Sequence, residues 1–311
     1  MIDNTASDAV AGVRSRILEK CDYFVNVQVW PLHDILDARG WLENFRDEEV
    51  EYAFHLLDFF MYYSERMIDA MLLSSFQNLS QILKPITATS GGLGNQWRLF
   101  VDTVLITYVT GEQPNVTDSG YTFARKARQV LEIPEDRILP PQRALAELLR
   151  SPRPIVLVDD FVGSGSQCIS TWHRQYPAYG GATRSFADIA KVAQANVYYC
   201  PVLCTSLGLR NIRRFCPGLI VRPAHLIDRR YNVLSSASMA WPPRLRPLAR
   251  DVLKQASKRA GIPDTGGKAV DDWQGFRRLG LALAFHNSVP DATLPLFYWE
   301  RNGWTPLLRK K

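Results

Sequence analysis

The stretch from Ile155 to Gln167, with the sequence IVLVDDFVGSGSQ, constrains the fold of this chain more than any other. Its first four residues are apolar and mostly β-branched, which indicates a strand buried on both faces, as in a parallel sheet. We expect this strand to end at two adjacent acids, Asp159 and Asp160, before a short loop with two glycines and two serines. A helix is expected from Ser164 to about residue 176. The order strand, glycine-rich loop, helix predicts an α/β fold.

The loop residues are suited to holding an anion. Ligands of parallel sheets bind beyond the carboxyl ends of the strands, and loop amides at the start of a helix attract phosphate. Two glycines allow the backbone to approach an anion closely, and two serines add hydroxyl donors. The predicted anion-binding residues are Val162, Gly163, Ser164, Gly165, Ser166 and Gln167.

The two acids narrow the class of ligand further. Asp159 and Asp160 would repel a phosphate unless they accept hydrogen bonds from another group, and the vicinal hydroxyls of a sugar are suited to this. The segment therefore predicts a site for a ribose 5-phosphate. A P-loop is excluded because no lysine follows the glycine, and a dinucleotide fingerprint is excluded because the third glycine is missing. An ordinary strand, turn and helix with surface acids is the alternative.

Strands and helices alternate around this segment. Buried strands are expected at 104–109, 196–204 and 218–221, and a helix is expected at 121–131. This alternation predicts a mostly parallel, Rossmann-like sheet.

The two ends of the chain differ from the middle. Apolar residues at helical spacing between Arg46 and Leu83 predict two or three helices within residues 10–83. A Lys-Pro step at 84–85 and the glycines after it mark a boundary. We expect three parts, namely an N-terminal helical region (1–85), an α/β core (86–235) and a C-terminal extension that packs on the core (236–311).

The net charge of +6 is unevenly distributed. Residues 1–90 carry 7 basic and 14 acidic side chains, whereas residues 205–250 carry nine arginines and one acid, Asp228. This asymmetry indicates either a polyanionic partner or an attraction between the two segments. Because the arginines are scattered among prolines and not interleaved with aromatic residues, a nucleic acid is the less favoured partner.

Several protein classes are excluded. No run of about 18 apolar residues occurs, so no segment is expected to span a membrane, and the first residues lack the features of a signal peptide. Five scattered cysteines argue against a secreted disulfide framework. We therefore expect a cytoplasmic protein.

The segment at 155–167 resembles the ribose-phosphate loop of type I phosphoribosyltransferases. In that loop an apolar strand, two acids and two apolar residues precede Thr-Thr/Ser-Gly, one further residue and Thr. The matching residues are Asp159 and Asp160 for the acids, Phe161 and Val162 for the apolar pair, and Ser164 and Gly165 for the Ser/Thr-Gly step. Gly163 and Gln167 each replace a hydroxyl residue of the family's pattern, which bears on phosphate affinity and turnover.

The resemblance implies a fold of phosphoribosyltransferase type, a substrate and a metal. Phosphoribosyl diphosphate would bind as its Mg²⁺ complex, with the metal held largely by the substrate and by Asp159 and Asp160. These two acids are the implied catalytic residues, which orient the ribose hydroxyls and stabilise positive charge at C1 as pyrophosphate leaves.

A second segment resembles the family's pyrophosphate loop and the helix after it. It comprises the strand at 104–109, a loop that ends at Ser119 and Gly120, and a basic helix. Ser119 and Gly120 at a helix N-terminus form a second anion site, within reach of Arg125 and Lys126. A basic helix face turned to solvent explains these two side chains equally well.

Most of the chain also resembles a narrower group, the phosphoribosyltransferase-like proteins of bacterial conflict and antiphage islands, some of them beside retron reverse transcriptases. Outside the acidic loop this resemblance rests on the order of WLENF at 41–45, DSGYTFARKAR at 118–128, LGLALAFHN at 279–287, TLPLFYW at 293–299 and GWTPLL at 303–308. His286 and Asn287 are then expected in a hood over the acceptor base. A turn that only docks the C-terminus is an equal alternative.

Two functions follow from these patterns. The first is a phosphoribosyltransferase-like enzyme, acting as an antiphage effector on a nucleotide or another cell component. The second is a catalytically weak nucleotide sensor that works with a partner protein in a protein–nucleic-acid complex of retron type. The intact acid pair favours the enzyme, whereas Gly163 and Gln167 favour the sensor.

Overall fold

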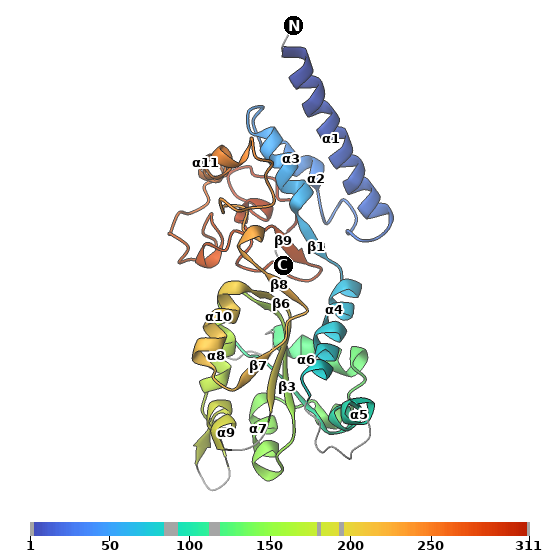
Figure 1. Ribbon diagram of the computed structural model, residues 1–311. Coiled ribbons are helices and arrows are strands. Elements are labelled where there is room, and N and C mark those ends of the chain that lie inside the picture. Colours follow the sequence, from blue (N-terminus) through green and yellow to red (C-terminus); the bar gives the residue numbers. More distant parts are fainter. Residues whose placement is uncertain (1–2, 84–92, 112–118, 179–181, 193–195, 310–311) are drawn as a thin grey trace. The chain divides into compact units, whose positions relative to one another are not determined.

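The computed structural model describes residues 3–83, 93–111, 119–178, 182–192 and 196–309. The chain forms two compact units (Figure 1). Unit 1 joins Met1–Glu65 to Asp228–Lys311, and unit 2 comprises Arg66–Ile227. Unit 2 is therefore inserted, in sequence, between the two halves of unit 1.

Unit 2 is built on a parallel sheet. Its strands are β2 (Leu105–Tyr108), β3 (Ile155–Val162), β6 (Val197–Thr205), β7 (Leu219–Val221) and β8 (His225–Ile227). They follow the order β2-β3-β6-β7, with β8 paired to the carboxyl end of β6. The central strands are almost wholly buried, which explains their nearly continuous apolar sequences. The predicted α/β fold with a mostly parallel sheet is confirmed.

Helices surround the sheet of unit 2. They are α4 (Glu65–Gln77), α5 (Leu93–Thr103), α6 (Ser119–Val130), α7 (Pro141–Arg150), α8 (Ser166–His173), α9 (Phe186–Val192) and α10 (Ser206–Phe215). Short 3₁₀ turns lie at Asn78–Gln81 and Glu135–Arg137, and β4 (Tyr176–Pro177) pairs with β5 (Thr183–Arg184). Helices α8 and α10 lie on one face of the sheet, and α4 and α6 lie on the other (Figure 1).

The helix after the glycine-rich loop is shorter than predicted. It begins at Ser166 rather than Ser164, because Gly165 has a φ of +83°, which is outside the helical region. It ends at His173, and Tyr176 instead belongs to the two-residue strand β4.

Unit 1 is formed by both ends of the chain. Its elements are α1 (Asp3–Asn26), α2 (Ala38–Leu42), α3 (Val50–Phe59), β1 (Met61–Tyr63), α11 (Arg246–Arg259), β9 (Leu283–Phe285) and 3₁₀ turns at Arg229–Tyr231, Phe276–Arg278 and Pro295–Phe297. Strands β1 and β9 pair in parallel, with Tyr62 opposite Ala284. A further bridge joins Leu36 to Leu308, so the two halves are connected through their backbones.

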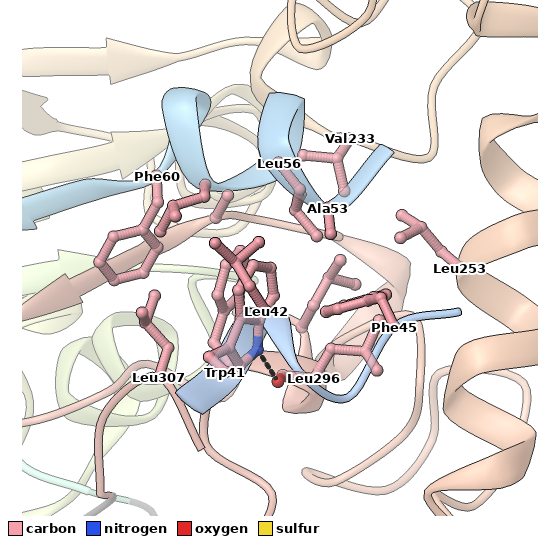
Figure 2. Packing of buried hydrophobic residues seen from close by; sticks show 14 of the residues in the cluster. Trp41, Leu42, Phe45, Ala53, Leu56, Phe60, Val233, Leu253, Leu296 and Leu307 are labelled. Atoms are coloured by element: carbon pink, nitrogen blue, oxygen red, sulfur yellow. Dashed lines mark hydrogen bonds between the residues drawn. The ribbon is translucent and has the colours of Figure 1, made fainter. Parts of the chain in front are cut away.

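The core of unit 1 is centred on Trp41 (Figure 2). Its indole N–H donates a hydrogen bond of 2.7 Å to the carbonyl oxygen of Leu296. Its ring stacks on Phe297 with a centroid separation of 5.5 Å. Trp41 is fully buried, and its partners lie more than 250 residues away in sequence, so the fold of this unit needs both ends of the chain.

The two units do not coincide with the three parts expected from the sequence. The helical pattern at 46–83 is interrupted by β1, and α4 belongs to unit 2. Residues 228–235 belong to unit 1 together with the C-terminal segment. Helical periodicity cannot indicate a three-residue strand such as β1, because its partner β9 lies more than 200 residues away. Among the described helices, none is long and apolar enough to cross a membrane.

Candidate functional site

The two acids lie within β3 and not at its end. The strand continues through Phe161 and Val162, which pair with Leu203 and Cys204 of β6. The expectation that the strand ends at the acids is therefore corrected. The physical reason is that the apolar residues after the acids continue the ladder with the fully buried strand beside them.

The Asp159 carboxyl is directed into the protein. It is 2 % exposed, and its Oδ2 accepts a hydrogen bond of 2.6 Å from the Tyr199 hydroxyl. Its Oδ1 accepts a bond of 3.0 Å from the Asp160 amide. Burial, followed by the neighbouring Asp160 carboxyl, raises the pKa of Asp159 well above its ordinary value. Both oxygens of Asp159 are thus engaged by the protein.

Asp160 is the more accessible of the two acids. It is 9 % exposed, and its Oδ1 accepts a hydrogen bond of 2.7 Å from the Phe161 amide. Its charge contributes to the raised pKa of Asp159. A pair of close carboxyl groups holds a proton, or binds a cation or hydroxyl donors, because two bare carboxylates repel each other.

The glycine-rich loop connects β3 to α8. Gly165 is left-handed, with φ +83° and ψ 2°, and occupies the position before the first helical residue, Ser166. The hydroxyl oxygens of Ser164 and Ser166 are 2.8 Å apart, at hydrogen-bond distance. The first amides of a helix lack intrahelical partners and carry partial positive charge. Gln167 lies in this first turn and is exposed.

Helix α10 holds the loop from one side. Thr205, the residue before α10, donates a hydrogen bond of 2.5 Å to the carbonyl oxygen of Gly163. The side chain of Asn211 donates one of 2.9 Å to the carbonyl oxygen of Ser164. In a trans peptide the N–H points opposite to the C=O, so the amides of Ser164 and Gly165 point away from α10. Within the described residues, neither amide donates a hydrogen bond.

Two glycines make this close packing possible. A Cβ on Gly208 would lie 2.7 Å from the Gly163 carbonyl oxygen, and a Cβ on Gly165 would lie 3.0 Å from the Gly208 carbonyl oxygen. Side chains at these positions would push α10 and the loop apart. Sequence reasoning missed Thr205, Gly208 and Asn211 as supports of the loop. The available signal was Thr-Ser-Leu-Gly directly after a buried strand, which is a helix N-cap pattern.

Arg174 holds the end of β2 in a similar way, and the sequence analysis missed it as well. Its guanidinium donates to the hydroxyl of Thr110 and, over 2.7 Å, to the carbonyl oxygen of Gly111. Thr171 of α8 adds a hydrogen bond of 3.1 Å to the carbonyl oxygen of Thr110. Gly111 is the last described residue before the predicted pyrophosphate loop, and residues 112–118 of that loop lie outside the described part.

The residues predicted around the pyrophosphate loop have different surroundings. Ser119 and Gly120 form the start of α6, as expected. Arg125 is exposed and lines a cavity of about 660 Å³ together with Tyr108 and Arg128. Lys126, in contrast, is 6 % exposed and its ammonium lies 2.7 Å from Asp69 Oδ1 of α4. Lys126 therefore has a carboxylate partner inside unit 2, and its contact with pyrophosphate stays a prediction.

His286 and Asn287 lie in unit 1, whereas the acids and the glycine-rich loop lie in unit 2. The His286 amide donates to the carbonyl oxygen of Tyr63 over 3.0 Å, and the Phe285 amide donates to that of Ser288. His286 Nε2 lies 4.0 Å from Glu65. The two residues thus form a turn after β9 that is anchored to β1, and their role as a hood stays a prediction.

The arginine-rich stretch is partly neutralised within the chain. Arg244 forms an ion pair with Glu51, and both belong to unit 1. Arg230 lies 2.7 Å from Asp228. The expected attraction between the acidic N-terminal segment and the arginines is therefore present for Arg244. The exposed arginines of α10 are Arg210, Arg213 and Arg214.

Within the described ranges, no group of three or more His, Cys, Asp or Glu side chains is arranged to hold a metal ion. A pair of neighbouring carboxyl groups, such as Asp159 and Asp160, suits Mg²⁺ only where substrate oxygens and water complete its coordination. Of the two, Asp160 fits this role better, since the Asp159 oxygens already accept hydrogen bonds from Tyr199 and from the Asp160 amide.

Comparison with known protein families identifies the family of this chain. The profile of the PRTase-CE family matches residues 38–310. Curated proteins provide no match. Among solved structures, the AQ2163 protein from Aquifex aeolicus is similar with 11 % identity and a TM-score of 0.31, over 62 % of this chain and 82 % of that chain. A likeness at this TM-score adds nothing to the assignment. The family match extends over both units, and the chain belongs to the PRTase-CE family of phosphoribosyltransferase-like proteins.

Proposed function

We propose that residues 162–167 bind the 5-phosphate of a ribose, as part of phosphoribosyl diphosphate or a nucleotide. The observation that carries this proposal is the anchoring of the loop by α10 through Thr205 and Asn211. This anchoring points the amides of Ser164 and Gly165 away from α10, next to the first turn of α8. Several amides that converge at a helix N-terminus attract a phosphate. The Ser164 and Ser166 hydroxyls are hydrogen-bonded to each other, and the one that accepts this bond keeps its own O–H as a further donor.

The two acids then take different roles. Asp160 accepts hydrogen bonds from the ribose hydroxyls, because it is the more accessible carboxyl. Asp159 is a positioning residue that acts through Asp160: it is held by Tyr199 and accepts the Asp160 amide. This division refines the sequence-based hypothesis, in which both acids contact the sugar.

Mg²⁺ fits this donor set as a metal bound mainly through the substrate. We propose Asp160 as its protein ligand, with pyrophosphate oxygens and water as the others, which is the usual coordination of this ion. When bound, Mg²⁺ neutralises charge on the pyrophosphate.

The reaction that suits this site is transfer of a phosphoribosyl group. The bond between C1 and the pyrophosphate oxygen breaks, the oxygen keeps the electron pair, and an acceptor nucleophile forms the new bond to C1. The loop amides hold the 5-phosphate in place throughout, which supplies proximity and orientation. The carboxylate of Asp160 stabilises the positive charge that develops on the ribose.

Nucleotide sensing without turnover is the second candidate function. It is favoured by the engagement of both Asp159 oxygens and by the exposed Gln167 and the glycine at 163, where the type I pattern has hydroxyl residues. A sensor needs the phosphate loop but does not need two acids directed at the sugar.

A binding and turnover experiment separates the two. Melting temperature is measured with phosphoribosyl diphosphate or ribose 5-phosphate, with and without Mg²⁺, and pyrophosphate release is measured with pooled acceptors. Stabilisation with release supports the enzyme, and stabilisation without release supports the sensor. Asp160→Asn should remove release, whereas Asp136→Asn, an exposed acid of the same unit, should not. No stabilisation by either ligand would overturn both functions.

We further propose that the protein acts in the bacterial cytoplasm as an antiphage effector, with a protein or nucleoprotein partner. This rests on the resemblance of residues 41–45, 118–128 and 279–308 to proteins of conflict islands. Phage plating efficiency on cells that express the chain with its neighbouring genes tests it. Loss of protection by Asp160→Asn is the expected result, and protection that persists in this variant would contradict it.

A further inference from the structure

A second cavity lies at the amino-terminal ends of the strands of the unit 2 sheet, whereas the glycine-rich loop follows the carboxyl end of β3. Pro154 and Asn196 line it, and they directly precede β3 and β6. Because β3 is eight residues long, its two ends lie roughly 25 Å apart, and so do the cavity and the loop. The cavity has a volume of about 640 Å³, which lies in the range of about 300–1,000 Å³ that small-molecule sites occupy.

One part of the cavity wall is aromatic and apolar. Phe100 of α5 and Tyr198 of β6 line it, with ring centroids 5.7 Å apart and an interplanar angle of 84°. Phe100 is held by stacking on Trp97 at 5.4 Å. Leu99, from the same helix, lines the cavity and is 49 % exposed. Phe100 and Tyr198 are 5 % and 3 % exposed, so Leu99 supplies most of the apolar surface that a flat ligand would remove from water.

Gln96 places an amide beside this wall. The residue is 8 % exposed, and its Oε1 has no hydrogen-bond partner among the described residues. An unpartnered buried carbonyl oxygen lowers the stability of the fold, whereas leucine at this position would fill a similar volume without that cost. A ligand N–H that donates to Oε1 removes the penalty. The orphaned acceptor therefore points to a ligand that carries such a donor.

Arg153 supplies a positive charge to the same cavity. It precedes Pro154, is half-buried, and forms no ion pair or side-chain hydrogen bond with other described residues. A guanidinium with this freedom is suited to phosphate or carboxylate. Asp102, exposed at the same cavity, adds an acceptor for a hydroxyl group.

We propose that this cavity is a second ligand site, which binds a heteroaromatic anion with the chemistry of a mononucleotide. The base packs against Leu99, beside Phe100 and Tyr198, and donates an N–H to Gln96 Oε1, while the phosphate pairs with Arg153. Each of the four common bases carries an N–H donor, so Gln96 can serve any of them. This site is distinct from residues 162–167, and it does not depend on their proposed function.

Equilibrium dialysis with AMP, GMP, UMP and CMP tests the proposal in the presence of saturating ribose 5-phosphate. At least one nucleotide should bind to the full chain with a stoichiometry of one nucleotide per chain. Gln96→Leu should weaken its binding at least tenfold and should leave the melting temperature equal or higher. Arg153→Ala should also weaken binding at least tenfold. Gln142→Leu and Arg143→Ala, at exposed positions of α7, serve as controls.

The proposal is wrong if none of the four nucleotides shows saturable binding. It is also wrong if both cavity variants bind the nucleotide with the affinity of the wild type. If Gln96→Leu fails to fold, Arg153→Ala still decides, because Arg153 is only half-buried and its replacement is less disruptive to folding. If ribose 5-phosphate does not bind residues 162–167, binding at the cavity is unaffected. The two proposals therefore fail independently.

Discussion

The hydroxyl of Thr205 donates a hydrogen bond of 2.5 Å to the carbonyl oxygen of Gly163. The hydroxyl oxygen of Thr205 in turn accepts a bond of 2.9 Å from the Gly208 amide, so one side chain caps α10 and holds the loop at residues 162–167. The geometry of the loop thus depends on a residue more than 40 positions later in the chain. Phosphate binding and the stability of α10 should respond together when this side chain is removed.

Thr205→Ala should lower the free energy of unfolding by about 0.5–2 kcal/mol, the usual cost of losing an N-cap side chain. It should also weaken ribose 5-phosphate binding, because the Gly163 carbonyl loses its anchor. Urea denaturation and calorimetric titration measure the two effects. Thr183→Ala, at an exposed position of β5, should change neither. Unaltered binding in Thr205→Ala would refute the anchoring role.

Gly165→Val should abolish binding of ribose 5-phosphate. The residue has a φ of +83°, and an added Cβ would lie 3.0 Å from both the Gly208 carbonyl oxygen and Ile212 Cγ1. Gly218→Val is the matched control, since Gly218 has a similar φ of +90° but open surroundings, with Ala190 Cβ at 3.5 Å. Both variants carry the same backbone strain. Equal loss of binding in both would mean that strain alone is responsible and that the loop has no special role.

Asp159→Asn should change the pH dependence of stability. The folded-state pKa of Asp159 lies well above its ordinary value of 3.8, so the folded state holds a proton that the unfolded state has released. Its stabilisation is complete below pH 3.8 and is lost as the pH rises toward the folded-state pKa. The Asn variant should therefore gain stability relative to the wild type as the pH rises from 4.5 toward the folded-state pKa, by up to about 1.4 kcal/mol per pH unit.

Urea denaturation of both proteins over this pH range measures the difference. Asp188→Asn is a control of opposite sign, because hydrogen bonds from Ser185 lower the pKa of Asp188. Its stabilisation is lost only as the pH falls below the ordinary value, so its difference from the wild type should stay flat above pH 4.5. If the difference in stability between Asp159→Asn and the wild type is also independent of pH, the raised pKa of Asp159 is contradicted.

Arg259→Ala should destabilise unit 1 by about 3 kcal/mol, because the Glu49 carboxylate would stay buried without its cation. Glu49 is 5 % exposed and forms an ion pair with Arg259. Arg244→Ala removes a second ion pair of the same unit, with Glu51, but the Arg244 side chain is 61 % exposed. Its cost should stay below about 1 kcal/mol. Chemical denaturation measures the free energy of unfolding of both variants. Equal losses would show that burial of Glu49 does not make its ion pair with Arg259 more important than the exposed pair.

We expect no tight nucleic-acid binding by the arginines at 205–250. Arg244 and Arg230 are engaged by Glu51 and Asp228, which reduces the charge offered to a phosphate backbone. A gel shift with single-stranded and duplex DNA and RNA over a range of salt concentrations measures this. Tight binding that weakens steeply with salt, and whose salt slope flattens in Arg229→Ala with Arg230→Ala, would reverse the expectation.

Much of unit 2 could be predicted from local sequence. The strands expected at 104–109, 196–204 and 218–221 correspond to β2, β6 and β7, because buried parallel strands are short continuous apolar runs. Local pattern was less informative where a residue's environment depends on distant partners. Lys126 has the sequence context of a basic helix face, yet Asp69 of α4 makes it a buried ion pair.

The sequence by itself determined the phosphoribosyltransferase-like class of this protein. An apolar run, two acids and a glycine-serine loop are contiguous, so the pattern is visible in the sequence without any knowledge of tertiary contacts. Only the tertiary structure decided that Asp159 is held by Tyr199, that α10 anchors the loop through Thr205, and that both ends of the chain share one core. Each of these relations joins residues dozens to hundreds of positions apart. Such contacts depend on strand order and helix packing, which no local periodicity encodes.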